Sequence, residues 1–165
     1  MKIILGVVAV IVVALIGIAA VPVISVSTWK TDTAIELTDM FATTQTNTDA
    51  TINFLENLEP TKADIGAEAE RAQSTKDELA KTAEGIDDLG PNTVDVTGQY
   101  AEAEELKDLI INNLVSLQGV YDEQATVLKD EQKNGSTVKT TTKYAELSEK
   151  ISVGYTELEQ LVARL

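Results

Sequence analysis

Side chains that could perform acid–base or nucleophilic chemistry occur in this 165-residue sequence mainly as close neighbours. Glu104 and Glu105 could exchange protons with a substrate, and Ser148 with Lys150 could supply a nucleophile and its base. Residues one or two positions apart do not face each other on a helix, however. This spacing is typical of solvated surface groups, and it predicts a protein that is not an enzyme.

The composition excludes further classes of chemistry. The sequence contains no cysteine and no histidine, which excludes a disulfide framework, a Cys/His zinc site, a histidine-ligated haem, a Ser-His-Asp triad and a lipid anchor on cysteine. We therefore expect no cofactor. The 27 acidic and 13 basic residues give a net charge of -14, which argues against binding nucleic acid through its phosphates.

Two loops contain groups that could bind an ion or a glycan. The acidic stretch 87–95 holds several oxygen ligands but lacks the spacing of an EF-hand, so it predicts a capped turn or a weak divalent-cation site. Asn134-Gly135-Ser136 matches the N-glycosylation sequon, with Asn134 as the acceptor. The simpler interpretation is that Asn-Gly forms a turn.

Threonine is concentrated in one region, with nine between Thr28 and Thr51. Thr44, Thr48 and Thr51 stand where apolar residues of a helical stripe would be expected. This pattern predicts a helix with polar layers; the alternatives are a glycosylated stalk near a membrane and a polar pocket that binds a small ligand. Gln124 lies on another apolar helix face, where it would fix register or bind a ligand.

The elements that must position these groups begin with an apolar segment. Ile3–Val26 contains no charged residue, and as a helix it would be roughly 36 Å long, more than the roughly 30 Å of a hydrocarbon core. We expect a transmembrane helix within an anchor of residues 1–29, an uncleaved signal-anchor. Trp29 and Lys30 then lie at the membrane interface. A signal peptide cleaved after Ala19 is the alternative.

The orientation follows from charge. The N-terminus carries only Lys2, whereas residues 30–165 hold every acidic residue of the chain. We therefore expect a single-pass protein in the lipid bilayer, with a cytoplasmic N-terminus and an extracytoplasmic domain of residues 30–165.

Residues 30–165 are divided by a few helix-breaking motifs. Pro60, Gly90-Pro91 and Asn134-Gly135 separate helices expected at about 30–58, 61–89, 99–133 and 137–165. Their similar lengths predict an all-α chain: an antiparallel four-helix bundle or coiled-coil domain after the anchor. Thr61 and Asp64 approximate a capping box. If Pro60 only kinks a longer helix, the expected arrangement changes.

Periodic apolar residues support the bundle. The last helix carries a stripe with one glycine gap, at which a neighbouring side chain could approach closely: Tyr144, Leu147, Ile151, Gly154, Leu158, Leu161 and Leu165. In the third helix the apolar face is widened by five additional residues: Leu109, Ile111, Val115, Val120 and Val127. This width is expected of a helix inside a bundle.

These features favour a non-catalytic structural or scaffolding protein that binds a protein partner, or itself by self-association, through helix packing. A ligand-sensing or solute-binding four-helix module is the second hypothesis, because an anchor followed by such a module resembles the layout of the periplasmic domains of chemoreceptors. A component of a surface layer, filament or virion membrane is the third.

Overall fold

The computed structural model describes residues 26–56, 61–89, 99–135 and 138–165. These residues form four α-helices, α2 (Val26–Glu56), α3 (Lys62–Leu89), α4 (Gln99–Asn134) and α5 (Val138–Val162), and none of them is in a strand. The prediction of an all-α fold with a four-helix bundle is confirmed for these residues. Helix α2 is described from Val26, so it includes the last residues of the expected anchor, 1–29.

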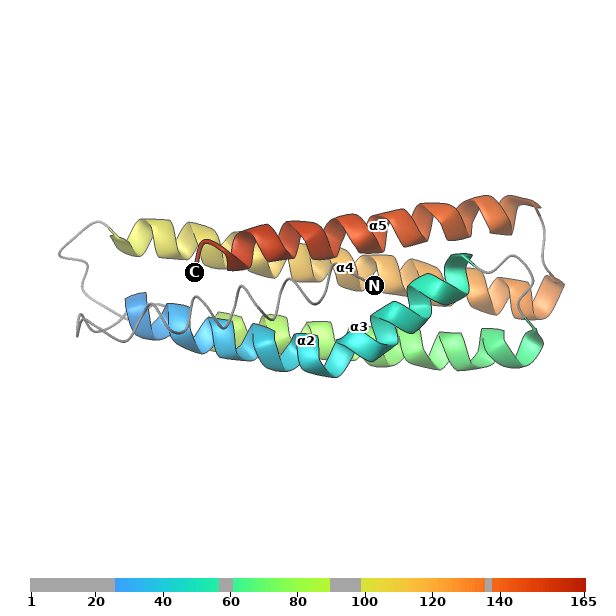
Figure 1. Ribbon diagram of the computed structural model, residues 1–165, viewed down its shortest axis with the longest axis horizontal. Helices are drawn as coiled ribbons and strands as arrows, with labels where there is room; N and C mark the ends of the chain where they lie inside the picture. Colours follow the sequence, from blue (N-terminus) through green and yellow to red (C-terminus); the bar gives the residue numbers. More distant parts are fainter. Residues whose placement is uncertain (1–25, 57–60, 90–98, 136–137) are drawn as a thin grey trace.

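The four helices lie side by side and alternate in direction, as Figure 1 shows. Along the described residues α3 packs against α2 and α4, and α5 packs against α4 and α2, so α3 and α5 occupy opposite corners. Lys30 Nζ donates a hydrogen bond to the carbonyl oxygen of Arg164 at 3.2 Å. The end of the chain therefore returns to the end of the bundle where α2 begins.

Two helix ends have the cap that the sequence predicts. At the start of α3, the Thr61 amide donates to Asp64 Oδ2 at 2.9 Å, and the Asp64 amide donates to Thr61 Oγ1 at 3.2 Å. After α4, Gly135 has a φ of 83° and its amide donates to the Glu131 carbonyl at 2.8 Å, which is a left-handed C-terminal cap. The expected break at Pro60 lies outside the described residues.

Helix α2 changes direction about midway along its length (Figure 1). Its threonine hydroxyls donate to backbone carbonyls four residues earlier: Thr38 to Ala34 at 2.6 Å, and Thr44 to Met40 at 2.9 Å. Such bonds compete with the helical hydrogen bonds and bend helices. The threonine-rich sequence therefore accounts for the bend.

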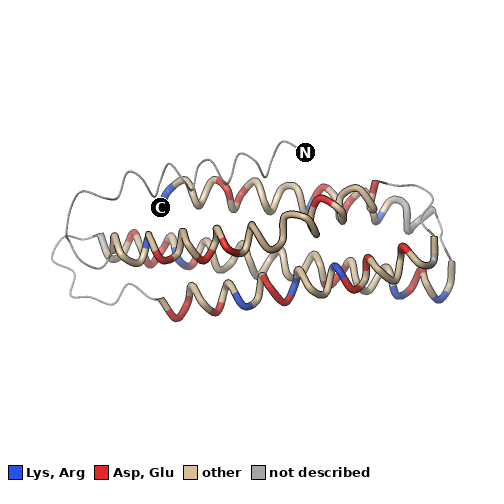
Figure 2. The backbone as a smooth tube through the Cα atoms, turned by 60° about the horizontal axis from the view of Figure 1, so that its bottom comes forward, with Lys and Arg blue, Asp and Glu red and all other residues tan. Residues whose placement is uncertain are grey.

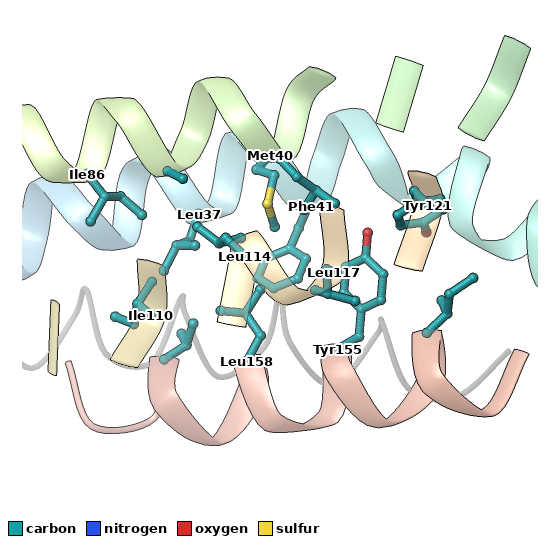
Figure 3. Packing of buried hydrophobic residues seen from close by; sticks show 14 of the residues in the cluster. Leu37, Met40, Phe41, Ile86, Ile110, Leu114, Leu117, Tyr121, Tyr155 and Leu158 are labelled. Atoms are coloured by element: carbon teal, nitrogen blue, oxygen red, sulfur yellow. The ribbon is translucent and has the colours of Figure 1, made fainter. Parts of the chain in front are cut away.

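The core consists mostly of aliphatic side chains with a few aromatic rings, as Figure 3 shows. Phe41 and Tyr155 contact each other with ring centroids 6.2 Å apart. The buried stripe of α5 differs in part from the predicted one, because it contains Tyr155 and Val162, whereas Leu161 is only partly buried. A helix of 3.6 residues per turn drifts relative to a strict repeat, and this drift moves the stripe.

The glycine gap of α5 is a site of close packing. A Cβ atom on Gly154 would lie 2.6 Å from Leu117 Cδ2 of α4 and 3.0 Å from its Cγ. Leu117 is itself 1% exposed, so its side chain has little room to move away. Gly154 therefore lets α5 approach α4 at this level, as the sequence predicted.

In the part of the chain that the structure describes, no helix combines the length and the apolar character needed to cross a membrane. The predicted transmembrane helix falls almost wholly on residues 1–25, which lie outside the described residues, as does the cleavage position considered at Ala19. The transmembrane prediction therefore remains an expectation.

Candidate functional site

The threonines that the sequence singled out lie in the bundle core. Thr44, Thr48 and Thr51 are each at most 1% exposed. Thr44 bonds to the backbone of its own helix, whereas Thr48 Oγ1 lies 3.2 Å from the Tyr121 hydroxyl and 3.1 Å from the Tyr155 hydroxyl. The Thr48 hydroxyl thus joins α2 to α4 and α5 at one level of the bundle, as a polar layer would.

A buried carboxylate forms the next part of this layer. Glu68 of α3 is 0% exposed, and its Oε1 accepts hydrogen bonds from Thr51 Oγ1 at 2.6 Å and from Gln124 Nε2 at 2.7 Å. Its other oxygen pairs with Arg71, which lies one turn along the same helix. Burial raises the pKa of Glu68, although the hydrogen bonds and the Arg71 charge act in the opposite direction.

Tyr121 belongs to the same buried layer. Burial, together with the neighbouring Tyr155, raises the pKa of Tyr121 well above its ordinary value. Further toward the end of the bundle that holds Gly135, the Tyr144 hydroxyl donates to the buried Glu131 carboxylate. These groups form directional contacts between helices, and a polar layer of this kind specifies which residues of neighbouring helices lie opposite each other.

Sequence reasoning missed Glu68 and Thr75, both of which are 0% exposed. The signal was present in their spacing, because they occupy regular steps of three and four in the stripe of α3 that continues through Ile65, Glu68, Ala72, Thr75 and Leu79. Lys76, the residue after Thr75, points away from this stripe and pairs with Asp122 of α4 at 2.5 Å.

A second feature lies on the outer face of α4 and α5. Thirteen consecutive residues of α4, 109–121, carry no charge, although acidic positions are spread along the helices in Figure 2. Leu109 is 38% exposed on this face and Val153 of α5 is 48% exposed, whereas Val115 of α4, which is 52% exposed, lines neither of the hollows between the two helices. The expectation that five residues widen the apolar face of α4 holds in part: Ile111, Val120 and Val127 are partly buried against the core, whereas Leu109 and Val115 lie at the surface.

Two adjoining hollows form a groove along this face, which we call the α4/α5 groove. One has a volume of about 640 Å³ and the other about 460 Å³, and both are lined by Ser116 and Glu157. The apolar lining comes from four side chains: Leu109, Val120, Val153 and Leu161. Gly119 lines the larger hollow, with no atom within 4 Å of where its Cβ would be. Small residues at its centre leave room for another side chain or helix.

The rim of the α4/α5 groove is predominantly acidic. Glu123 pairs with Lys143 at 2.5 Å and with Lys150 at 2.9 Å, and these lysines lower its pKa. Glu149 and Glu157 have no cationic partner among the described residues, although Asn113 donates to Glu157 at 3.4 Å. The groove therefore combines an apolar floor with unneutralised carboxylates.

The remaining predicted residues lie at the two ends of the bundle. Trp29 is 2% exposed and packs in the core, which leaves Lys30 as the more accessible of the expected interfacial pair. Lys30 and Arg164 line a hollow of about 320 Å³ at this end. Asn134 is exposed at the end of α4, while Ser136 of the sequon lies outside the described residues.

Most of the acidic stretch 87–95 lies outside the described residues. Asp87 and Asp88 are exposed at the end of α3, and residues 90–95 lie outside the described ranges. Among the described residues there is no group of three or more side chains positioned to hold a metal ion.

No family model, curated protein or solved structure matches this chain.

Proposed function

We propose that the chain is a membrane-anchored, extracytoplasmic helical bundle that acts without catalysis, by binding another protein through helix packing. The α4/α5 groove is the observation that carries this proposal. Apolar side chains there are exposed on a chain whose net charge is -14. An exposed apolar face bordered by polar residues is typical of a protein-binding surface.

The anchor is supported by the sequence and by the course of the chain. The uncharged run Ile3–Val26 leads directly into α2, which begins at Val26. Arg164 lies beside Lys30, so the bundle has one end near the anchor and extends away from it. In this arrangement the α4/α5 groove lies on the side of the bundle and stays accessible to a partner.

The contacts of the threonines support binding to protein more than sensing of a small ligand. A sensing module would need its hydroxyl groups to face a cavity, whereas Thr48 and Thr51 bond to Tyr121, Tyr155 and Glu68 of the same chain. The hollows described above are lined by other residues. A role in a surface layer, filament or virion membrane would use the same groove between copies of this chain.

Membrane anchoring is tested by expressing the full chain and a variant without residues 3–25 in a bacterial host. We expect the full chain to resist alkaline extraction from membranes, and protease added to spheroplasts to digest residues 30–165. The shortened variant should be released. Extraction of the full chain, or protection of its bundle until the membrane is broken, would contradict the proposed anchoring or orientation.

Protein binding is tested with a photoreactive amino acid placed at Val153 in the α4/α5 groove. The matched control is the same substitution at Ile35, which is 46% exposed on α2. We expect a discrete cross-linked product in membranes from Val153 but not from Ile35. Equal labelling from both positions, or none from Val153, would contradict a binding role for this face.

A further inference from the structure

We infer that the α4/α5 groove binds a basic amphipathic helix, with the apolar face of that helix on the groove floor and its cations on the carboxylates of the rim. This inference deepens the proposed function and rests on it. Helix-in-groove binding requires a long apolar channel, accessible anchor sites and complementary charge.

The dimensions of the groove suit a helix. Its lining on α4 extends from Leu109 to Glu123, a span of roughly 21 Å at 1.5 Å per residue, or about four helical turns. Ser116 and Gly119 occupy the middle of this span, where small residues permit close approach of a second helix. Leu109 and Val153 supply exposed apolar contacts for the partner.

The charges of the rim specify the partner's chemistry. Four carboxylates line the two hollows, against the cations of Lys150 and Arg164. Glu149 and Glu157, without cationic partners among the described side chains, are eight residues apart on α5, which corresponds to about 12 Å. A partner helix with lysine or arginine at positions seven or eight residues apart would reach both.

The same charges disfavour a second copy of this chain in the groove. A two-fold interface places the same surface on both sides, so Glu149 and Glu157 of each copy would approach acidic groups of the other. The net charge of -14 adds repulsion between copies. An anionic lipid surface is disfavoured for the same reason.

The test uses the full chain in nanodiscs of zwitterionic lipid and two fluorescent 18-residue peptides. One peptide has leucine and alanine on one face and lysines spaced seven or eight residues apart on its flank; in the other, glutamates replace the lysines. Anisotropy is measured with empty nanodiscs in parallel, because amphipathic peptides also bind lipid. We expect the lysine peptide to bind the protein and the glutamate peptide to bind at least about tenfold more weakly.

Variants locate the binding surface. Gly119→Gln projects a side chain into the open centre of the groove, and we expect it to weaken binding of the lysine peptide about tenfold or more. Glu149→Gln should weaken binding less and reduce its salt dependence. Ile35→Gln on α2 is the matched control and should leave binding unchanged. Circular dichroism melting confirms that each variant is folded.

The outcomes separate this inference from the proposed function. Equal binding of the lysine peptide to wild type and Gly119→Gln, or equal binding of both peptides, would overturn the basic-helix inference. A dimer in mass measurements that Gly119→Gln dissociates would also overturn it, by identifying a second copy as the occupant, while the proposed protein-binding function would stand. No peptide binding, no dimer and no cross-linking from Val153 would overturn both.

Discussion

Two glycines in neighbouring helices should respond in opposite ways to the same added methyl group. Alanine in a helix interior is more favourable than glycine by about 1 kcal/mol, chiefly because glycine loses more backbone entropy on folding. At Gly119 of α4 the new Cβ would have no atom within 4 Å, so we expect Gly119→Ala to raise the free energy of unfolding by about that amount.

At Gly154 of α5 the methyl group would meet Leu117. Separations of 2.6 Å to Cδ2 and 3.0 Å to Cγ are far below ordinary van der Waals contact, and Leu117 is 1% exposed. Forcing an extra methyl group into a packed core costs about 1–3 kcal/mol, which equals or exceeds the helix-propensity gain. We therefore expect Gly154→Ala to be neutral or destabilising by up to about 2 kcal/mol.

Urea unfolding of both variants, followed by circular dichroism, measures the difference directly. The contrast between Gly119→Ala and Gly154→Ala should be about 1–3 kcal/mol. Removing the obstacle with Leu117→Ala should convert Gly154→Ala into a stabilising change, so that a double-mutant cycle yields a favourable coupling energy. If Gly154→Ala stabilises wild type as much as Gly119→Ala does, the close approach of α5 to Leu117 is wrong.

Three further predictions concern stability. Because burial raises the pKa of Glu68, the folded protein holds the proton of this carboxyl group more tightly than the unfolded chain does, so ionisation of Glu68 lowers the free energy of unfolding as pH rises above about 4.3. Glu68→Gln should therefore gain stability relative to wild type between that pH and neutrality. A difference in unfolding free energy between the two proteins that does not vary with pH would contradict this. Leu158→Ala, at a site 0% exposed, should cost about 2–5 kcal/mol in urea unfolding, and a loss below about 1 kcal/mol would remove Leu158 from the core. Added salt should raise the melting temperature by screening a net charge of -14, and an unchanged value would contradict the assumed repulsion.

The sequence was sufficient to predict the helical class because several signals agreed. The capping residues Thr61 and Asp64, the glycine at 135 and the repeats of apolar residues all indicated helices and their ends. Each signal depends on neighbours within a few residues, which a sequence displays directly. The close approach at Gly154 was also predictable, because the glycine interrupts an otherwise continuous apolar stripe.

The buried polar residues were harder to predict from the sequence. Thr44, Thr48 and Thr51 stood out by their number, but their partners Tyr121, Tyr155 and Glu68 lie on other helices. A glutamate on an apolar stripe normally indicates a surface position, because burying a carboxylate without partners is costly. Only the packing of α2, α3 and α4 shows that Thr51, Gln124 and Arg71 satisfy Glu68.

The outer face of α4 explains why the candidate binding surface escaped prediction. Leu109 extends an apolar face that also contains Leu106 and Ile110, and in sequence the three look alike. Two neighbouring helices bury only the part of that face that they can reach, so Leu106 and Ile110 are buried while Leu109 remains exposed and lines the α4/α5 groove. A helix can bind an additional helix only if its apolar face is wider than its neighbours in the bundle can cover. The wide apolar face of α4, which in the sequence predicts a helix inside a bundle, is therefore in the folded protein an argument for a binding partner.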